Sequence, residues 1–190
     1  MPSTTFEREI KLRFSSVDEA RVAILATGAT PLLGRRLQED ALLDNDEEEL
    51  RRRRCVLRVR TENGKSRLTF KGPVQPGLMK VREEIETVVG DGAILLRVLE
   101  ELGLHIWFRY EKYREEFAHE DVIVAIDETP VGVFVEIEGG EQGIAAMAEA
   151  LGRTPDDYIL DSYRGLYLRY REEHGLTCPD MVFPEPDGRL

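Results

Sequence analysis

Charged and apolar residues alternate in six separate segments of this chain. In the first segment, FEREIKLRF at residues 6–14, Glu7, Glu9 and Lys11 would point to one side of an extended strand, because successive side chains of a strand point to opposite faces. The apolar side consists of Phe6, Ile10, Leu12 and Phe14. The pattern returns in VLRVR, LTFKG, KVREEIE, YEKYR and VFVEIEG. Alternation with a period of two predicts β-strands, so the chain is predicted to form a sheet with one apolar face and one almost purely ionic face.

Amphipathic helices between these strands indicate which face of the sheet lies outside. Capping signals predict a helix from Ser16 to Gly28 and another from Asp91 to Gly103, and two more helices are predicted over residues 141–152 and 162–175. The apolar side of a helix must pack on an apolar sheet face, so helices outside a curved sheet would leave its charged face inside. A closed antiparallel barrel of about eight strands has room for one small ligand. We therefore predict an α+β fold, a closed eight-stranded antiparallel β-barrel with a charged lumen and helices packed outside.

Turn signals predict the remaining organisation of the chain. Asn63-Gly64 predicts a tight hairpin, a second hairpin is predicted at Thr129-Pro130, and a short strand is predicted around Leu37–Leu43. The length of 190 residues suits one domain, which we place at residues 1–175. Residues 176–190 are rich in Pro and Asp and are predicted to form a loosely attached C-terminal tail.

Composition narrows the class of ligand and the compartment. The net charge is −11, whereas a nucleic-acid-binding protein of this size is usually basic, and no apolar run approaches the ~20 residues of a membrane span. We therefore expect neither a nucleic-acid nor a membrane partner. Lys and Arg concentrate in residues 51–71 and 109–114, which suits a small polyanion bound in a cavity. The lack of a signal-peptide core, and two cysteines without ligand-like spacing (Cys55 and Cys178), favour a cytoplasmic protein with reduced thiols.

The predicted ionic face separates into two chemical groups. Its bases are Lys11, Arg58, Arg60, Lys71, Arg82, Lys112 and Arg114, and its acids are Glu7, Glu9, Glu84, Glu86, Asp127, Glu136 and Glu138. Arginine grips phosphate oxygens with a planar fork, and lysine adds a compact positive charge. Carboxylates two residues apart on a strand can converge on a hard cation such as Mg²⁺, which typically uses one or two carboxylates together with substrate phosphates. The two groups together predict metal-dependent chemistry on linked phosphates.

These segments resemble a known family. The residues EREIK, with Glu7, Glu9 and Lys11, match the ExExK signature of the CYTH superfamily. This superfamily includes class IV adenylyl cyclases and thiamine triphosphatases, and its members are also called triphosphate tunnel metalloenzymes. The resemblance continues in order through LRVR, LTFKGP, REEIE, KYR and DETPVGVFVEIEG to Ser162-Tyr163, and covers roughly residues 5–170. It implies an eight-stranded triphosphate tunnel and an enzyme that uses Mg²⁺ or Mn²⁺.

The resemblance also implies roles for individual side chains. Glu7, Glu9 and Glu138 would hold the metal, and Asp127 and Glu136 would serve the same acidic cluster or a second metal. Phosphate binding would fall to Lys11, Arg58, Arg60, Lys71, Arg82, Lys112 and Arg114, and catalysis to Glu7, Glu9, Lys11 and Lys112. Members with a glutamine-rich second strand often carry an aromatic pair after it, where this chain has Leu42 and Leu43. Trp107 and Phe108 are interpreted as core residues, and Tyr163 as a packing residue that reaches toward the tunnel mouth.

Three functions are compatible with this pattern. The first is a metal-dependent triphosphatase that hydrolyses inorganic triphosphate, thiamine triphosphate or a nucleoside triphosphate. The second is a class IV adenylyl cyclase, in which the ribose 3′ hydroxyl attacks the α phosphate in the same tunnel. The third is a non-catalytic polyphosphate-binding module, which the seven acids of the ionic face disfavour. The missing aromatic pair and the lack of an adenine-reading constellation favour the triphosphatase. A small-molecule triphosphate is the expected partner, and a homodimer is left open.

Overall fold

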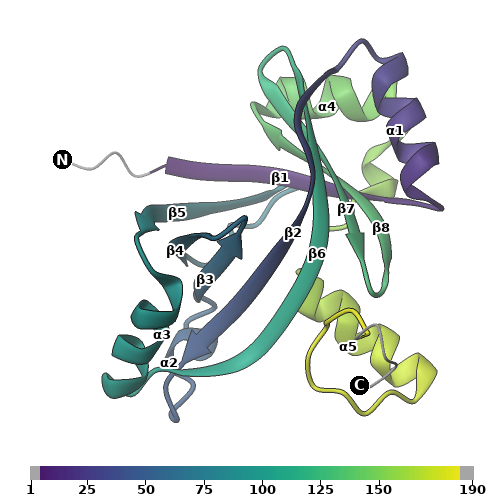
Figure 1. The fold of residues 1–190 in the computed structure, drawn as a ribbon. Coiled ribbons are helices and arrows are strands. Elements are labelled where there is room, and N and C mark those ends of the chain that lie inside the picture. Colours follow the sequence, from purple (N-terminus) through teal and green to yellow (C-terminus); the bar gives the residue numbers. More distant parts are fainter. Residues whose placement is uncertain (1–4, 185–190) are drawn as a thin grey trace.

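Eight antiparallel strands close into a barrel, as predicted (Figure 1). A computed structural model describes residues 5–184. The strands are β1 (Thr5–Phe14), β2 (Thr30–Asp44), β3 (Val56–Glu62), β4 (Lys65–Lys71), β5 (Lys80–Val89), β6 (His105–His119), β7 (Val122–Thr129) and β8 (Gly132–Gly139), and they pair in the order β1–β5–β4–β3–β2–β6–β7–β8, with β8 closing against β1. The helices are α1 (Val17–Ala26), α2 (Glu49–Arg52), α3 (Gly92–Glu101), α4 (Glu141–Ala150) and α5 (Tyr163–His174), with a 3₁₀ turn at Pro155–Asp157. None of these helices has the length and apolarity that crossing a membrane requires.

Local sequence signals account for the ends of these elements. Asn63 and Gly64 both adopt positive φ angles, 49° and 73°, and form the tight turn between β3 and β4. The Ser16 Oγ accepts a hydrogen bond from the Glu19 backbone N–H at 3.1 Å, and Asp91 caps α3 in the same way. These contacts confirm the predicted hairpin and the predicted starts of α1 and α3.

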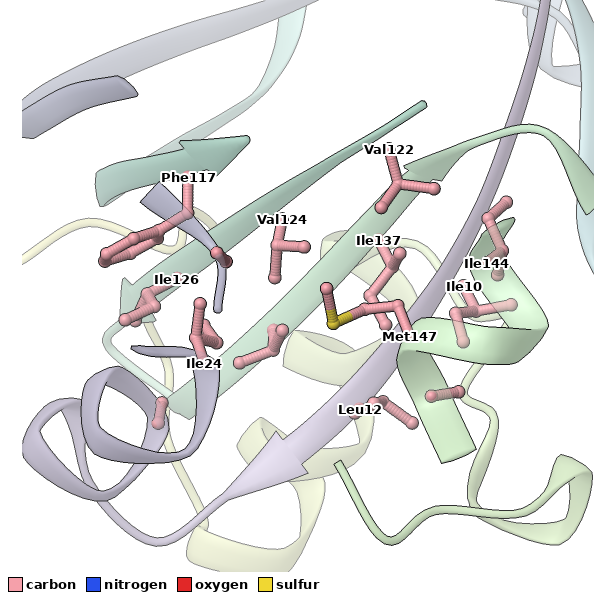
Figure 2. Packing of buried hydrophobic residues seen from close by; sticks show 14 of the residues in the cluster. Ile10, Leu12, Ile24, Phe117, Val122, Val124, Ile126, Ile137, Ile144 and Met147 are labelled. Atoms are coloured by element: carbon pink, nitrogen blue, oxygen red, sulfur yellow. The ribbon is translucent and has the colours of Figure 1, made fainter. Parts of the chain in front are cut away.

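The main apolar core lies outside the barrel, between the sheet and two helices. Figure 2 shows Ile10 and Leu12 of β1 and Ile137 of β8 among side chains that include Ile24 of α1 and Met147 of α4. All five are at most 2% exposed. Burying each such side chain stabilises the fold by about 1.5–3 kcal/mol. The apolar strand faces therefore point outward here, which leaves the charged faces to line the lumen.

A second apolar cluster fastens α5 to one end of the barrel. Tyr163 and Leu166 of α5 pack with Phe108 of β6 and Phe134 of β8, and all four side chains are buried. The ring of Tyr163 meets that of Phe134 edge-on, with the centroids 5.7 Å apart. This packing holds the first turn of α5 against the lumen, which Tyr163 and Arg164 help to line.

The structure corrects two predictions about the strands. Phe6 is 59% exposed and does not join the core. Helix α4 packs over the part of β1 that pairs with β8, whereas residues 5–8 of β1 pair with β5 and lie beyond it. The short strand predicted around Leu37–Leu43 is the end of a longer one, because β2 pairs along nearly its whole length with the equally long β6.

The prediction of a loosely attached tail is wrong for residues 176–184. Met181 is fully buried, its N–H donates to the Arg109 carbonyl at 3.0 Å, and its carbonyl accepts from the Glu111 N–H at 2.8 Å. The Phe183 ring lies 5.2 Å from that of Tyr113. Two apolar side chains and these backbone hydrogen bonds dock this Pro- and Asp-rich segment on β6. The rest of the predicted tail, residues 185–190, lies outside the described residues.

Candidate active site

The barrel lumen is a cavity of about 1360 Å³ whose wall is mostly charged. The residues of the predicted ionic face that line it are Glu7, Glu9, Lys11, Arg58, Arg60, Lys71, Arg82, Glu84, Glu86, Lys112, Arg114, Glu136 and Glu138. Strand register explains how they meet. β1 aligns Glu9 with Glu138 and Lys11 with Glu136 on β8. Each of these pairs is directly cross-strand, so their side chains start close together.

Asp127 lies behind the lumen wall and orients three other side chains. Its fully buried carboxylate accepts hydrogen bonds from Arg114 Nε at 2.7 Å, Lys112 Nζ at 2.7 Å and Tyr163 Oη at 2.6 Å. Arg114 Nη2 adds a further bond at 2.5 Å. Both carboxylate oxygens are therefore engaged by donors. Because Asp127 is fully buried and, unlike Glu7 and Glu9, does not line the cavity, the geometry supports a role in positioning the two cations and gives no support to the prediction that it binds metal.

Tyr163 holds two lysines as well as packing against the barrel. The Nζ atoms of Lys112 and Lys11 lie 4.8 and 4.9 Å from the centroid of its ring. Burial and the charge of Arg114 lower the pKa of Lys112 to about 8, despite its acidic neighbours. Tyr163 thus links the first turn of α5 to cations of β1 and β6, a role that goes beyond the packing predicted from sequence.

Glu136 is surrounded by cations. Lys11 Nζ lies 2.9 Å from Glu136 Oε1, and Arg114 donates to Glu136 Oε2. Burial alone would raise the pKa of Glu136, but Lys11, Lys112 and Arg114 outweigh burial and lower this pKa well below its ordinary value. Burial alone would likewise lower the pKa of Lys11, but Glu136 is the first of the acids that raise it. Glu136 is therefore ionised and, like Asp127, serves to hold positive side chains.

Glu7 and Glu9 begin the acidic part of the lumen, and each is paired. Glu7 accepts hydrogen bonds from Lys71 Nζ at 2.6 Å and from Arg82 Nε at 3.1 Å. Glu9 accepts one from Lys80 Nζ at 2.5 Å. Burial opposes ionisation of both carboxyls, but nearby cations lower the pKa of each below its ordinary value. Both carboxylates are therefore ionised and held in place.

Glu138 differs from these acids because, among the described residues, it has no ion-pair partner. It lies opposite Glu9 across the β1–β8 pair. Partial desolvation at the edge of the lumen, where Glu138 keeps some contact with solvent, and the charges of Glu7 and Glu9 raise the pKa of Glu138 to about 7. Negative charge is therefore left uncompensated at this point.

The donors Glu7, Glu9 and Glu138 fit a hard divalent cation in their chemistry, because carboxylate oxygens suit Mg²⁺ and Mn²⁺. Within residues 5–184, no three His, Cys, Asp or Glu side chains are grouped as a complete metal site. Mg²⁺ typically takes one or two carboxylates and completes its shell with water and substrate phosphates. The donor set therefore fits a cation that binds together with a phosphate ligand.

Arg58 and Arg60 form the cationic wall on β3, oriented by Asp40 on β2. Arg60 donates to both oxygens of Asp40, at 2.9 and 3.1 Å. Arg58 Nη2 donates to Thr69 Oγ1 at 3.3 Å, but its buried Nε, although 3.4 Å from Asp40 Oδ1, forms no hydrogen bond with any residue in the described range. A buried donor without a partner is costly, and a phosphate oxygen would satisfy it.

Two more acids of the predicted ionic face serve as pairing partners. Glu84 Oε2 lies 2.9 Å from Lys71 Nζ, and Glu86 Oε1 accepts from Arg67 Nη1 at 2.9 Å. In both contacts an acid of β5 orients a cation of β4.

Sequence reasoning missed several residues of this site. Asp40 and Lys80 are buried and contact predicted site residues. The signal was present, because Asp40 shares a strand face with Gln38 in β2 and Lys80 precedes Arg82 by two residues in β5. Extending the same alternation along each strand would have found both.

Known proteins share this fold and sequence pattern. The family model described as CYTH domain matches residues 5–175. A Methanocaldococcus jannaschii protein named "putative adenylate cyclase" is 29% identical over 174 residues, covering 84% of this chain and 99% of that protein. The structure of a Vibrio parahaemolyticus protein, also named "putative adenylate cyclase", superposes with a TM-score of 0.78 at 17% identity, covering 87% of this chain and 99% of the other. A Hippeastrum protein described as a "putative adenylyl cyclase" with a dominant triphosphatase activity has a TM-score of 0.62 at 21% identity, covering 91% and 98%. These structures share the barrel.

Proposed function

The chain belongs to the CYTH domain family, and from this membership we propose that it is a metal-dependent triphosphatase that hydrolyses a small triphosphate inside the barrel. The observation that carries the proposal is the separation of charge within one enclosed lumen. The seven bases of the lumen pair with acids of the same barrel, the buried Nε of Arg58 lies 3.4 Å from Asp40 Oδ1 without forming a hydrogen bond, and Glu138 keeps uncompensated negative charge. The first two features suit phosphate oxygens, and the third suits a divalent cation.

The phosphate chain would be held by cations whose positions are already set. Asp40 orients Arg60, and Asp127 orients Lys112 and Arg114. Because these side chains are fixed before the ligand binds, they can stabilise charge on the phosphates without reorganising. Holding the chain in one geometry also favours in-line attack of water on the terminal phosphorus. Lys11, Lys71 and Arg82 would complete the contacts from the neighbouring strands.

Glu7, Glu9 and Glu138 would hold the divalent cation, Mg²⁺ or Mn²⁺. When bound, the cation would supply charge neutralisation at the phosphates and activation of the attacking water. The chain itself contributes two carboxylates of β1 that are fixed by cations, Glu7 and Glu9, and a third, Glu138, that β8 places opposite Glu9.

An adenylyl cyclase is the second candidate, favoured by the names of the M. jannaschii and V. parahaemolyticus relatives. It would use the same side chains with the phosphates shifted along the lumen, so that the α phosphate lies at the reacting position. The Hippeastrum protein supports the hydrolase in the same fold. A non-catalytic polyphosphate binder is the weakest candidate, because such a protein gains nothing from an unpaired acid at Glu138.

The experiment offers the purified protein inorganic triphosphate, thiamine triphosphate and ATP, each with Mg²⁺, with Mn²⁺ and with EDTA. Orthophosphate and cyclic AMP are both measured. We expect metal-dependent orthophosphate release and little cyclic AMP, and we expect Glu9→Gln to lose this activity while remaining folded. Cyclic AMP as the main product would overturn the proposal in favour of the cyclase, and full activity of Glu9→Gln would overturn the metal assignment.

A further inference from the structure

Trp107 lines the lumen because of an irregularity in β6. In the β2–β6 register, Leu42 is opposite Phe108, whereas the next residue, Leu43, is opposite Ile106. Trp107 is therefore an extra residue in the strand, a β-bulge, and bulges re-aim side chains near functional sites. Phe108 is buried as predicted, but Trp107 is only half-buried and forms part of the cavity wall. Trp107 packs against the second apolar cluster, as its interpretation as a core residue implies, but it also lines the lumen, which that interpretation did not include.

Two arginines from separate elements lie over the indole of Trp107. The Cζ atoms of Arg51 in α2 and Arg164 in α5 are 4.4 and 4.8 Å from the ring centroid. Arg51 is anchored, because its Nε lies 3.2 Å from Asp44 Oδ2. Arg164 has no ion-pair partner within residues 5–184, and its burial and the charge of Arg51 lower its pKa. Because no ion pair holds Arg164 in place, its guanidinium, rather than that of Arg51, is the group that another planar group can replace on the indole.

The lumen is larger than a triphosphate needs, and its wall near Trp107 is partly apolar. About 1360 Å³ exceeds the ~300–1,000 Å³ of pockets for drug-sized ligands. Leu42 and Val56 line the cavity and belong to the same apolar cluster as Trp107. The cavity therefore offers a ligand an apolar wall near Trp107 in addition to the seven bases.

The register also relates this wall to the phosphate-binding arginines. Leu42 is opposite Phe108 on one side and Arg58 on the other. Arg58 therefore lies two strand spacings, roughly 10 Å, from the part of β6 that carries Trp107. This separation suits an aromatic ring that is joined through a sugar to its first phosphate.

We propose that Trp107, with Arg51 and Arg164, forms a subsite for the base of a nucleoside triphosphate. The base would replace Arg164 on the indole, Leu42 and Val56 would cover its apolar edges, and the phosphates would extend to Arg58. Stacking of this kind accepts any base, because every base has an aromatic face. The inference rests on the proposed function for the phosphate end of the ligand and adds the substrate class.

Trp107 is the single tryptophan of the chain, so its fluorescence reports on the subsite directly. ATP and inorganic tripolyphosphate are titrated into the wild-type protein in EDTA, where metal-dependent turnover is stopped, with excitation at a wavelength that adenine does not absorb. Calorimetry measures binding of both ligands in parallel. We expect ATP to change the Trp107 emission strongly and tripolyphosphate to leave it nearly unchanged. Equal responses, no response to bound ATP, or no ATP binding would each overturn the subsite.

Variants extend the test to kinetics. Trp107→Ala should raise KM for ATP about tenfold, because stacking of one base contributes roughly that factor or more, and should change KM for tripolyphosphate less than about twofold. Trp107→Phe keeps a ring and should restore most of the ATP affinity. Tyr113→Ala is the matched control, because Tyr113 is also on β6 and is also covered by an arginine, Arg35 at 3.5 Å, but does not line the lumen. An equal change for both ligands in Trp107→Ala would refute the inference.

The subsite and the proposed function fail in different ways. If ATP binds and alters the Trp107 emission but neither ligand is hydrolysed with metal, the subsite stands and the triphosphatase proposal falls. If both ligands are hydrolysed equally and Trp107 does not respond, the triphosphatase stands and the subsite falls.

Discussion

Replacing Asp40 with Asn should destabilise the barrel and at the same time loosen its phosphate-binding arginines. The Asp40 side chain is fully buried, and it contacts Arg60 Nε at 2.9 Å and Arg58 Nε at 3.4 Å. Asparagine keeps the size of the side chain but removes its charge. Two arginines that are about nine-tenths buried would then lack their shared anion.

The size of the effect follows from this burial. Removing one partner of a buried ion pair costs about 3–5 kcal/mol, and the open lumen beside Arg58 places Asp40 at the lower end, about 3 kcal/mol. For a chain of this length, each kcal/mol lowers the melting temperature by about 2–4 °C. Asp40→Asn should therefore melt roughly 6–12 °C below the wild type, and KM for triphosphate should rise.

The effect should also depend on pH. Burial alone would raise the pKa of Asp40, but Arg60 and Arg58 outweigh burial and lower this pKa below its ordinary value of 3.8. As pH falls, the unfolded chain takes up the proton first, so the stabilisation from ionised Asp40 is fully present above about pH 4 and is lost below it. The stability difference between wild type and Asp40→Asn should shrink as the pH falls through this range.

Urea unfolding of both proteins at pH 7 and at pH 3.5 measures these free energies. Asp161→Asn is the control, because Asp161 also pairs with an arginine, Arg169 at 2.7 Å, but about half of each side chain is exposed. Exposed pairs contribute at most about 1 kcal/mol. Equal losses in the two variants at pH 7 would show that Asp40 is not the buried anion described above.

Three further predictions concern other parts of the molecule. Arg58→Ala should raise KM for triphosphate and lower kcat together. The control Arg97→Ala, at an exposed position of α3, should match the wild type. An unchanged kcat/KM for Arg58→Ala would place Arg58 outside the substrate site. The pKa of Glu138 is raised from its ordinary value of 4.5 to about 7, so ionisation of Glu138 opposes folding increasingly as the pH rises from about 4.5 to 7. Glu138→Gln should therefore stabilise the metal-free protein above pH 7, by about 1 kcal/mol after solvent screening. Chemical unfolding at pH 4 and pH 8 measures this, and a loss of stability at pH 8 would contradict it. Met181→Ala should destabilise the protein by about 2 kcal/mol in urea, and no loss would show that the C-terminal segment contributes nothing.

The alternation along each strand was enough to predict the barrel and most of the lumen. Successive side chains of a strand point to opposite faces. The two-residue spacing of Glu7, Glu9 and Lys11 therefore predicted that they share one face of the sheet, even though their pairing partners were unknown. The pairings themselves depend on strand register, which joins residues far apart in the chain, such as Arg60 with Asp40. Asp127 shows why register matters. Its place in the sequence resembles that of a metal ligand, but in the fold it lies behind Lys112 and accepts a hydrogen bond from it.

Features that break the alternation could not be predicted from it. Trp107 reaches the lumen because a bulge shifts the register of β6, and the place of that bulge depends on the pairing with β2, which the pattern of a single strand does not contain. Phe6 has the spacing of a core residue, but its burial depends on where the helices pack. The docking of Met181 depends on two apolar residues in a segment whose composition resembles a loop.

The central claim is that water attacks the terminal phosphorus of a triphosphate inside this barrel. Phosphorus NMR of the products, formed from ATP and Mg²⁺ in ¹⁸O-enriched water, tests it most directly. The account predicts orthophosphate that carries one ¹⁸O from the solvent, with the remaining nucleotide unlabelled. Cyclic AMP with unlabelled pyrophosphate would contradict it, because the attacking oxygen would then come from the substrate itself.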